Sequence, residues 1–254
     1  MGRLEGKVAI ITGGNSGIGE KAAELFAKEG AKVVISARRE VQLEEVAAKV
    51  RAQGGEILSI PCDISKPEQC AALVEKTVKQ YGTVDILVNN AGVLDSGLDS
   101  VEKVSDETID YLMDINAKGT MYVTRDCAKI MLEKKAGSIV NVSSVAGQCG
   151  NGGAAYVASK AALIGLTKNI AMRGAESKVR CNAVCPGSVV TPMTMNLQRD
   201  KLDVNMFSAM NKHADNSLPP CMPEEVANVL LFLASDESDA VTGQIMVVDH
   251  GANL

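Results

Sequence analysis

Residues 7–19 read Lys7-Val-Ala-Ile-Ile-Thr12 and continue directly into Gly13-Gly-Asn-Ser-Gly17-Ile-Gly19. The first part is almost continuously apolar, which is typical of a parallel strand buried on both faces. An amphipathic helical pattern follows and ends at Gly30. A strand, a glycine turn and a helix N-terminus form an anion-binding site, because free backbone N–H groups and the helix dipole point at one spot. The stretch therefore predicts an α/β fold whose first turn lets a pyrophosphate approach the backbone.

The rest of the chain alternates short apolar runs with helical patterns and contains no linker, internal repeat or low-complexity segment. Such alternation specifies a doubly wound parallel sheet. We expect a single Rossmann-type α/β domain over residues 1–254, with a seven-stranded parallel sheet and helices on both faces. The one long irregular stretch, residues 187–221, is expected to form a substrate-binding lid. Predicted strands are 8–12, 32–36, 56–60, 86–89, 138–143, 180–185 and 245–248, and predicted helices after the first are 41–52, 67–81, 106–134, 154–173 and 223–234.

Composition excludes several kinds of partner. The net charge of −5 and the isoelectric point near 5.2 argue against nucleic acid or an anionic membrane. No apolar run is long enough to span a bilayer and no signal sequence opens the chain, so a cytoplasmic location is expected. Seven cysteines without a C-x-x-C pair suit free thiols in a reducing compartment. His213 and His250 have no cysteine–carboxylate cluster near them in the sequence, so no metal site is expected.

Tyr156 and Lys160 carry the strongest chemical signal. Four positions apart on a predicted helix, they point the same way. A nearby cation favours the phenolate, so the pKa of Tyr156 is expected to fall below its free value of about 10. A serine facing the phenol, for which Ser143 is the candidate, would hydrogen-bond a carbonyl or alcohol oxygen. These groups suit moving a proton on or off that oxygen while a hydride arrives at or leaves its carbon.

The chain resembles the short-chain dehydrogenase/reductase family over nearly its whole length. Each matching motif is weak to moderate alone, whereas their order and spacing together are specific. The motifs are Thr12-Gly-x-x-x-Gly-Ile-Gly19, Asp63, Asn89-Asn-Ala-Gly92, Asn116, Ser143, Tyr156-x-x-x-Lys160, and Pro186-Gly187 with Thr191.

The resemblance implies a catalytic role for each of four residues. Tyr156 would exchange a proton with the substrate oxygen, and Lys160 would lower its pKa and hold the nicotinamide ribose. Ser143 would position and polarise the substrate oxygen. Strand alternation puts Ser143 and Ser144 on opposite faces, and the family spacing selects Ser143. Asn116 would hold a water that links Lys160 to solvent, although a purely structural role is about equally expected for a buried asparagine.

The resemblance also implies a nicotinamide-dinucleotide site. Asp63 would contact the amino group of the adenine ring, or it would serve only to cap the turn before Pro67. Asn90 and the Ala91-Gly92 backbone would lie beside the adenosine ribose, whereas Asn89 is expected to be a strand-end polar group. The full set of expected cofactor-binding residues is Gly13, Asn15, Ser16, Gly17, Ile18, Gly19, Arg38, Arg39, Asp63, Ile64, Asn90, Ala91, Gly92, Tyr156, Lys160, Pro186, Gly187, Val189 and Thr191.

The end of the second predicted strand indicates the cofactor. An NAD enzyme of this type places Asp or Glu there to hold the ribose 2′-hydroxyl. This chain has Ala37 at that position, followed by Arg38 and Arg39. A guanidinium binds a 2′-phosphate through charge-assisted bonds, so NADP(H) is expected, with Arg38 as the main contact and Arg39 more solvated.

Three function classes remain open. The leading one is an NADP-dependent dehydrogenase or reductase of a bulky apolar secondary alcohol or ketone, such as a hydroxysteroid or bile acid. The second is a 3-oxoacyl-carrier-protein reductase, for which Arg125, Lys129 and Lys168 would supply basic residues at the pocket mouth. The third, a catalytically silent nucleotide-sensing protein, is remote because the chain keeps the serine, tyrosine and lysine.

The lid sequence favours the first class. Its apolar, flexible residues are expected to adapt to a rigid hydrocarbon, and Met206 and Phe207 are the expected substrate contacts. The alternative is that these residues only pack short helices onto the rest of the domain. Small residues over 147–153 would open the facing wall. These lid residues are Met193, Met195, Leu197, Leu202, Met206, Phe207, Met210 and Leu218.

Two further expectations concern the surface. Family members are commonly homotetramers. In one type of subunit contact they pair the long helices that are expected here over 106–134 and 154–173. In the other, the last strand packs against its copy across a second symmetry axis. The family usually ends its last strand with Asp-Gly-Gly, whereas this chain has Asp249-His250-Gly251. His250 is expected to be a surface or subunit-contact residue, or else to reach a neighbouring substrate pocket.

Overall fold

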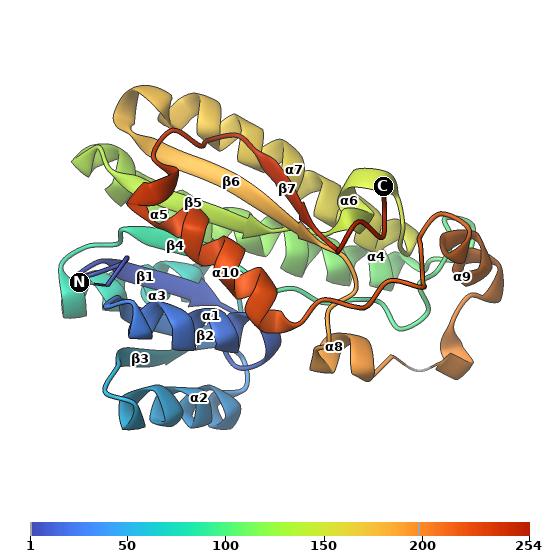
Figure 1. Cartoon of the computed structure of the whole chain (residues 1–254), viewed down its shortest axis with the longest axis horizontal. Helices are drawn as coiled ribbons and strands as arrows, with labels where there is room; N and C mark the ends of the chain where they lie inside the picture. Colours follow the sequence, from blue (N-terminus) through green and yellow to red (C-terminus); the bar gives the residue numbers. More distant parts are fainter. Residues whose placement is uncertain (1, 198) are drawn as a thin grey trace.

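The computed structural model describes residues 2–197 and 199–254, so Met1 and Gln198 of the expected domain and lid lie outside the described residues. A seven-stranded parallel sheet with the order β3-β2-β1-β4-β5-β6-β7 forms the centre of the molecule (Figure 1). The predicted strands are confirmed, and no strand end differs from its predicted position by more than one residue. They are β1 Val8–Thr12, β2 Lys32–Ala37, β3 Glu56–Pro61, β4 Ile86–Asn89, β5 Gly137–Val142, β6 Val179–Pro186 and β7 Ile245–Val248.

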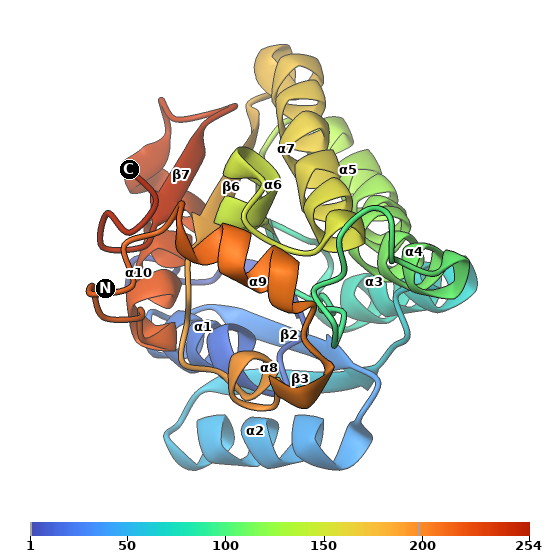
Figure 2. The ribbon, with the colours of Figure 1, turned by 90° about the vertical axis from the view of Figure 1, so that its right-hand side faces the viewer.

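Helices cover both faces of this sheet. α1 (Gly17–Lys28), α2 (Glu40–Ala52) and α10 (Pro223–Ala234) pack on one face, and α3 (Pro67–Tyr81), α5 (Thr120–Lys134) and α7 (Ala154–Gly174) pack on the other (Figures 1 and 2). Strand alternation supplies both cores: Ile11 faces the first layer, whereas Ile10 faces the second. This two-sided burial explains why the strands read as continuous apolar runs.

The chain winds outward from β1 in two directions. β1, β2 and β3 build one half of the sheet, and β4 then pairs with β1 on its other side and starts the second half. Ligands of such sheets bind outside the carboxyl ends of the strands at this reversal. The architecture therefore places the functional site at the ends of β1 and β4.

The prediction of one continuous helix over 106–134 is wrong. It consists of α4 (Asp106–Leu112), a π-helical segment (Met113–Gly119) and α5. Within the segment a Cβ on Gly119 would lie 2.8 Å from Ile64 Cγ1, so the helix passes very close to the loop after β3. π-helical turns inside helices are often found at functional sites.

The stretch 187–221 is also more regular than expected. It contains α8 (Pro192–Met195), a 3₁₀ turn (Arg199–Lys201) and α9 (Val204–Asn211), and α9 crosses the carboxyl edge of the sheet (Figure 2). A short helix, α6 (Val145–Cys149), follows β5 and was not predicted. The seven cysteines are free thiols, as expected. In the part of the chain that is described, every helix is too short or too polar to cross a bilayer.

Candidate active site

One large cavity opens at the carboxyl ends of the central strands. Its volume is about 1350 Å³, and it runs from the turn after β1, past the ends of β4 and β5, to α8 and α9. Pockets for a single small ligand typically measure about 300–1,000 Å³. The cavity therefore has room for a dinucleotide and a second molecule side by side.

The glycine turn after β1 forms one end of the cavity. Gly13 and Gly17 have positive φ angles of 68° and 58°, a conformation that favours glycine. Ser16 precedes α1 but makes no side-chain cap, so the first N–H groups of the helix stay open to a ligand. A buried hydroxyl without a partner, that of Ser36, also lines this region. Free helix donors at an uncapped N-terminus fit the pyrophosphate of a nicotinamide dinucleotide.

Asn90 holds this turn in place. Its Nδ2 donates to the carbonyls of Thr12 and Gly13 at 3.0 and 3.1 Å. A Cβ on Gly19 would lie 2.2 Å from the Gly13 carbonyl oxygen, so Gly19 is buried against the turn and is not part of the cavity lining. This glycine allows the turn to close, and its predicted contact with the cofactor remains a prediction.

The two arginines after β2 lie at the rim of the same half of the cavity. The Asn15 amide, oriented with its oxygen toward Arg39, accepts hydrogen bonds from Nη2 at 2.7 Å and Nε at 3.2 Å. Arg39 is thus tied to the glycine turn although both arginines are exposed, so the relative solvation of the two remains a prediction. Asp63 also lines the cavity, while its Oδ1 accepts from Ser65 N at 3.0 Å and so caps the turn as well.

Lys160 and Tyr156 lie on the floor of the cavity. Lys160 Nζ donates to the Val142 carbonyl at 3.0 Å and lies 5.7 Å from the centre of the Tyr156 ring. Burial lowers the pKa of Lys160 to about 8. Part of the Tyr156 side chain faces the cavity, yet the surrounding protein is dense enough that burial raises its pKa to about 12. The expected lowering of the Tyr156 pKa is therefore wrong for the chain without ligands, because burial is the larger effect.

Of the two serines after β5, Ser144 and not Ser143 has its side chain beside the Tyr156 phenol. Ser143 Oγ donates to the Lys160 backbone carbonyl at 2.8 Å and is buried. Ser144 is the residue whose side-chain hydrogen bond lowers the pKa of Tyr156, against the larger effect of burial. Both serines follow the end of β5 and line the cavity, and Ser144 is the one beside the phenol. Ser144 is the N-cap of α6, a helix that the sequence did not predict, so this assignment needed the structure.

The side-chain amide of Asn116 makes its hydrogen bonds to other residues of the chain. Its Oδ1 accepts from Val93 N at 2.8 Å, and its Nδ2 donates to Val93 O at 2.9 Å and to Ser159 Oγ at 3.0 Å. The residue is fully buried and outside the cavity lining, so its side chain has a structural role, and the water relay to Lys160 remains a prediction. It still borders Lys160, since a Cβ on Gly92 would lie 3.3 Å from Asn116 Oδ1 and 3.2 Å from Lys160 Nζ.

Asp95 is a cavity residue that the sequence did not reveal. Only 7% of its surface is exposed, and its Oδ2 accepts from Asp99 N at 2.9 Å. Its Oδ1 has no hydrogen-bond partner among the described residues. Burial raises the pKa of Asp95, and its negative charge in turn contributes to the raised pKa of Tyr156.

The small residues between β5 and α7 do more than widen the cavity on the side that faces the lid. A Cβ on Gly147 would lie 2.6 Å from the backbone carbon of Lys160, so this glycine lets α6 pack directly on α7. A Cβ on Gly153 would lie 2.7 Å from Asp95 Oδ2. Only Asn151 and Gly152 of the span 147–153 line the cavity, so the expected open wall is corrected: most of these glycines serve close packing.

The lid contributes an apolar side to the cavity. Phe207 and Met210 of α9 line it, whereas Met206 does not, which corrects the choice of Met206 as a substrate contact. Asp203 anchors α9: its Oδ1 accepts from Lys103 Nζ at 2.7 Å and its Oδ2 from Ser100 Oγ at 2.7 Å, and these bonds hold its pKa well below the usual range. Of the eight apolar lid residues singled out from the sequence, those in the lining are Met193, Leu197, Phe207, Met210 and Leu218.

The structure brings nearly all the predicted residues to this one cavity. Gly19 and Asn116 pack behind it, as described above. The predicted residues that line it are Gly13, Asn15, Ser16, Gly17, Ile18, Arg38, Arg39, Asp63, Ile64, Asn90, Ala91, Gly92, Ser143, Tyr156, Lys160, Pro186, Gly187, Val189 and Thr191.

Comparison with known proteins agrees with this geometry. A family model described as enoyl-(acyl carrier protein) reductase matches residues 13–253. The chain is 40% identical over 250 residues to a 3-oxoacyl-[acyl-carrier-protein] reductase of Thermotoga maritima, covering 98% of both. It belongs to the short-chain dehydrogenase/reductase family.

Other relatives of the family have different names. A 3beta-hydroxysteroid dehydrogenase of Eggerthella lenta is 34% identical over 250 residues, which is 98% of this chain and 95% of that protein. The crystal structure of levodione reductase superimposes with a TM-score of 0.89 at 31% identity and covers 98% of both chains. The chain is thus an oxidoreductase of the family that acts on alcohol or ketone groups.

The environment of Tyr156 leads to a testable prediction. In the ligand-free protein this phenol should stay protonated when exposed tyrosines ionise near pH 10. Asp95→Asn should lower its pKa, because removing a negative charge favours the phenolate. An ultraviolet difference titration against Tyr156→Phe isolates this one residue among the four tyrosines. An unchanged titration in Asp95→Asn would show that the two groups are not electrostatically coupled.

Proposed function

We propose that the chain transfers a hydride between NADP(H) and a bulky apolar secondary alcohol or ketone, with hydroxysteroids the leading class. The observation that carries the proposal is the position of Tyr156, which lies over buried Lys160 and opens into a cavity with an apolar lid. The nicotinamide supplies or accepts the hydride at the substrate carbon. The residues of the chain bind the substrate and handle the proton at its oxygen.

Tyr156 is the proton donor to the carbonyl oxygen in reduction and the acceptor in oxidation. Its raised pKa keeps the donor form present at neutral pH. Lys160 lies beneath it, and a pKa of about 8 lets this amine exchange a proton near neutral pH. Ser144, beside the phenol, holds the substrate oxygen in line with it. We therefore assign to Ser144 the role that the sequence suggested for Ser143.

The preference for NADP(H) rests on the rim after β2. Ala37 offers no carboxylate that would repel a 2′-phosphate, and Arg38 and Arg39 both border the cavity there. Arg39 is already fixed by Asn15, so little side-chain entropy is lost when it binds an anion. Arg38 supplies a second, more mobile guanidinium.

The apolar lid favours a hydrocarbon substrate. Leu94 and Leu98 line the cavity in addition to Phe207 and Met210 of α9, and together they form a surface suited to a large rigid ring system. The relatives named as 3beta-hydroxysteroid dehydrogenases support this class.

A 3-oxoacyl-carrier-protein reductase is the alternative, and the Thermotoga relative carries that name. Its acidic partner protein would need free basic residues at the cavity mouth. Arg125 and Lys129 instead lie on α5 and pair with Asp126, at 3.2 and 2.9 Å. Neither they nor Lys168 line the cavity, so the geometry gives this alternative less support.

We also propose a homotetramer, on the family pattern. Exposed apolar side chains on the helices expected to pair are consistent with it: Ile109 and Tyr111 on α4, Met121 on α5 and Met172 on α7. A light-scattering mass equal to the 26.6 kDa monomer at micromolar concentration would exclude it.

The serine assignment predicts unequal effects of two neighbouring substitutions. Ser144→Ala should lower kcat by about 10²–10³-fold, since it removes a donor to the reacting oxygen. Ser143→Ala should leave kcat within severalfold and cost about 1 kcal/mol of stability through one buried hydrogen bond. Tyr156→Phe should abolish turnover while NADPH affinity changes little. Steady-state kinetics measure the effect on turnover, and thermal melts measure the effect on stability. A larger loss of kcat in Ser143→Ala than in Ser144→Ala would instead assign the substrate oxygen to Ser143.

The cofactor assignment predicts a preference for NADPH over NADH. Arg38→Ala and Arg39→Ala should each raise the KM for NADPH, by about 10- to 150-fold if a charged contact worth about 1.5–3 kcal/mol is lost. The KM for NADH should change little. Ala37→Asp should invert the preference, because a carboxylate repels the phosphate and binds the 2′-hydroxyl. Equal use of both cofactors by the unmodified chain would refute the assignment.

The substrate assignment predicts a lower KM for a hydroxysteroid than for a short-chain ketone or a sugar. Phe207→Ala and Met210→Ala should raise that KM with little effect on cofactor affinity. Val204→Ala is the matched control, because Val204 lies on the same helix, is 77% exposed and is outside the cavity lining. Equal efficiency on acetoacetyl thioesters, with no response to the two substitutions, would favour the carrier-protein reductase.

A further inference from the structure

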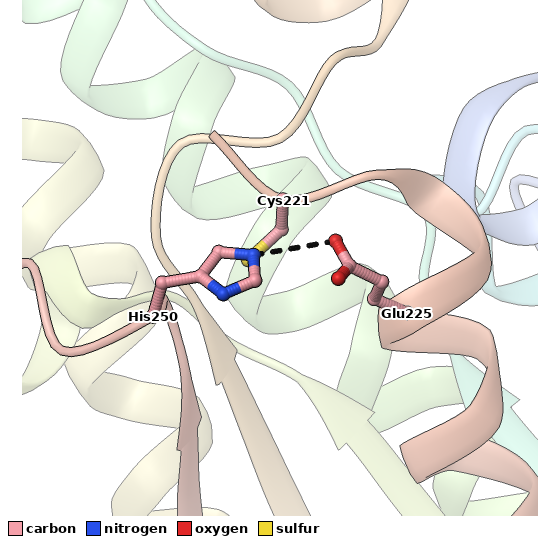
Figure 3. Close-up of side chains that lie close together, drawn as sticks. All are labelled: Cys221, Glu225 and His250. Carbon is pink, nitrogen blue, oxygen red and sulfur yellow. Dashed lines mark ion pairs between the residues drawn. The ribbon is translucent and has the colours of Figure 1, made fainter. Parts of the chain in front are cut away.

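A second group of chemically reactive side chains lies outside the cavity lining. Cys221 ends the lid, Glu225 lies in the first turn of α10, and His250 follows β7 (Figure 3). Their ligating atoms all lie within 4.8 Å of one another. The expectation that no cysteine–carboxylate cluster lies near a histidine is therefore wrong, because the fold joins segments far apart in the sequence.

We propose that Cys221, Glu225 and His250 form a binding site for a divalent transition metal ion, with Zn²⁺ the best match. A thiolate sulfur, an imidazole nitrogen and a carboxylate oxygen are the three donor types that zinc takes from proteins. A magnesium or calcium ion would instead require a shell of oxygens. Three protein donors leave a fourth position, which water can fill.

The distance between two of the three donors matches that of ligands on one metal ion. His250 Nε2 and Glu225 Oε2 are 3.4 Å apart (Figure 3). Two tetrahedral zinc ligands with bonds of about 2.0–2.2 Å lie about 3.3–3.6 Å apart. A charge-assisted hydrogen bond between the same groups would be shorter, at about 2.7–2.9 Å. The separation of 3.4 Å is compatible with two ligands of one zinc ion, and without a metal the same two groups form an ion pair when His250 is protonated.

The backbone holds each donor independently of a metal. Cys221 N donates to Ser188 O at 2.8 Å, and Cys221 O accepts from Val190 N at 2.9 Å. Glu225 Oε2 accepts from Met222 N at 2.7 Å, which fixes the carboxylate at the start of α10. His250 has a φ of 56°, an uncommon conformation for a residue with a side chain, and this turn directs the imidazole toward the other two donors.

The site is accessible on one side and anchored on the other. The side chains of His250 and Glu225 are 37% and 45% exposed, whereas Cys221 is 1% exposed. An ion can therefore enter from solvent and meet the thiol beneath. The preceding residue, Asp249, lines the cavity and lies against Gly187, where a Cβ would be 2.6 Å from Asp249 Cβ. A bound ion would tie together both ends of the lid segment 187–221 and the turn after β7, so its role is structural.

Metal binding can be measured without reference to catalysis. The full chain, stripped with a chelator and exchanged into chelator-free buffer, should bind one Zn²⁺ per chain in a calorimetric titration, and its Tm should rise. Added Co²⁺ should give a thiolate-to-cobalt charge-transfer band in the near ultraviolet. Cys221→Ser should remove that band, and both Cys221→Ser and His250→Gly should weaken Zn²⁺ binding by at least about 100-fold, more than the about 10- to 100-fold typical of changes to groups that only support a ligand.

The variants are chosen so that loss of folding does not imitate loss of binding. His250→Gly suits the positive φ at this position, and Glu225→Gln keeps an oxygen that can accept from Met222 N. Cys149→Ser and His213→Asn are matched controls, because Cys149 is an exposed thiol and His213 is the other histidine.

Both controls should bind Zn²⁺ as the unmodified chain does. Absence of stoichiometric binding, or unchanged binding in folded Cys221→Ser and His250→Gly, would overturn the proposal. Loss of binding in either control instead would assign the metal to an adventitious surface site and overturn it equally.

Discussion

The buried ammonium of Lys160 is the constraint on which the rest of the site depends. Removing a charge from water costs several kcal/mol unless hydrogen bonds replace the lost solvent. The Val142 carbonyl provides one bond at 3.0 Å, and the pKa falls to about 8, so part of the cost is met by loss of the proton. The surrounding chain packs tightly on this residue: a Cβ on Gly92 would lie 3.2 Å from the ammonium, and one on Gly147 would lie 2.6 Å from the Lys160 backbone. The Ser143 bond to the Lys160 carbonyl fixes the same turn of α7 from the strand side.

The strands were predictable because their signal is local. A buried parallel strand must be apolar at every position, and the runs that end at Thr12 and Asn89 show this without reference to their partners. The convergence of the site residues was predictable for a related reason: parallel strands bring their carboxyl ends to one edge of the sheet.

The errors concern features set by tertiary contacts. Strand alternation predicted that Ser143 and Ser144 face opposite sides, but both lie beyond the end of β5 and line the cavity. Which of the two lies beside the phenol depends on how α7 packs. The π-helical segment arises where Gly119 passes Ile64, a contact between distant elements. The pKa of Tyr156 depends on how densely the protein surrounds it, and spacing from Lys160 contains no such information.

The cavity divides into a rigid half and a variable half. The half beside β1 is built largely from backbone: a glycine turn closed by Asn90 and an uncapped helix start. The lid half is attached at its margins, where Val189 pairs with Cys221 and Asp203 is bonded to Lys103 and Ser100. Between these attachments the side chains that face the substrate belong to short helices that pack on little else. Substitutions there can alter the substrate surface while Tyr156 and Lys160 keep their positions. This separation gives a physical reason why relatives named for carrier-protein substrates and for steroids can belong to one family.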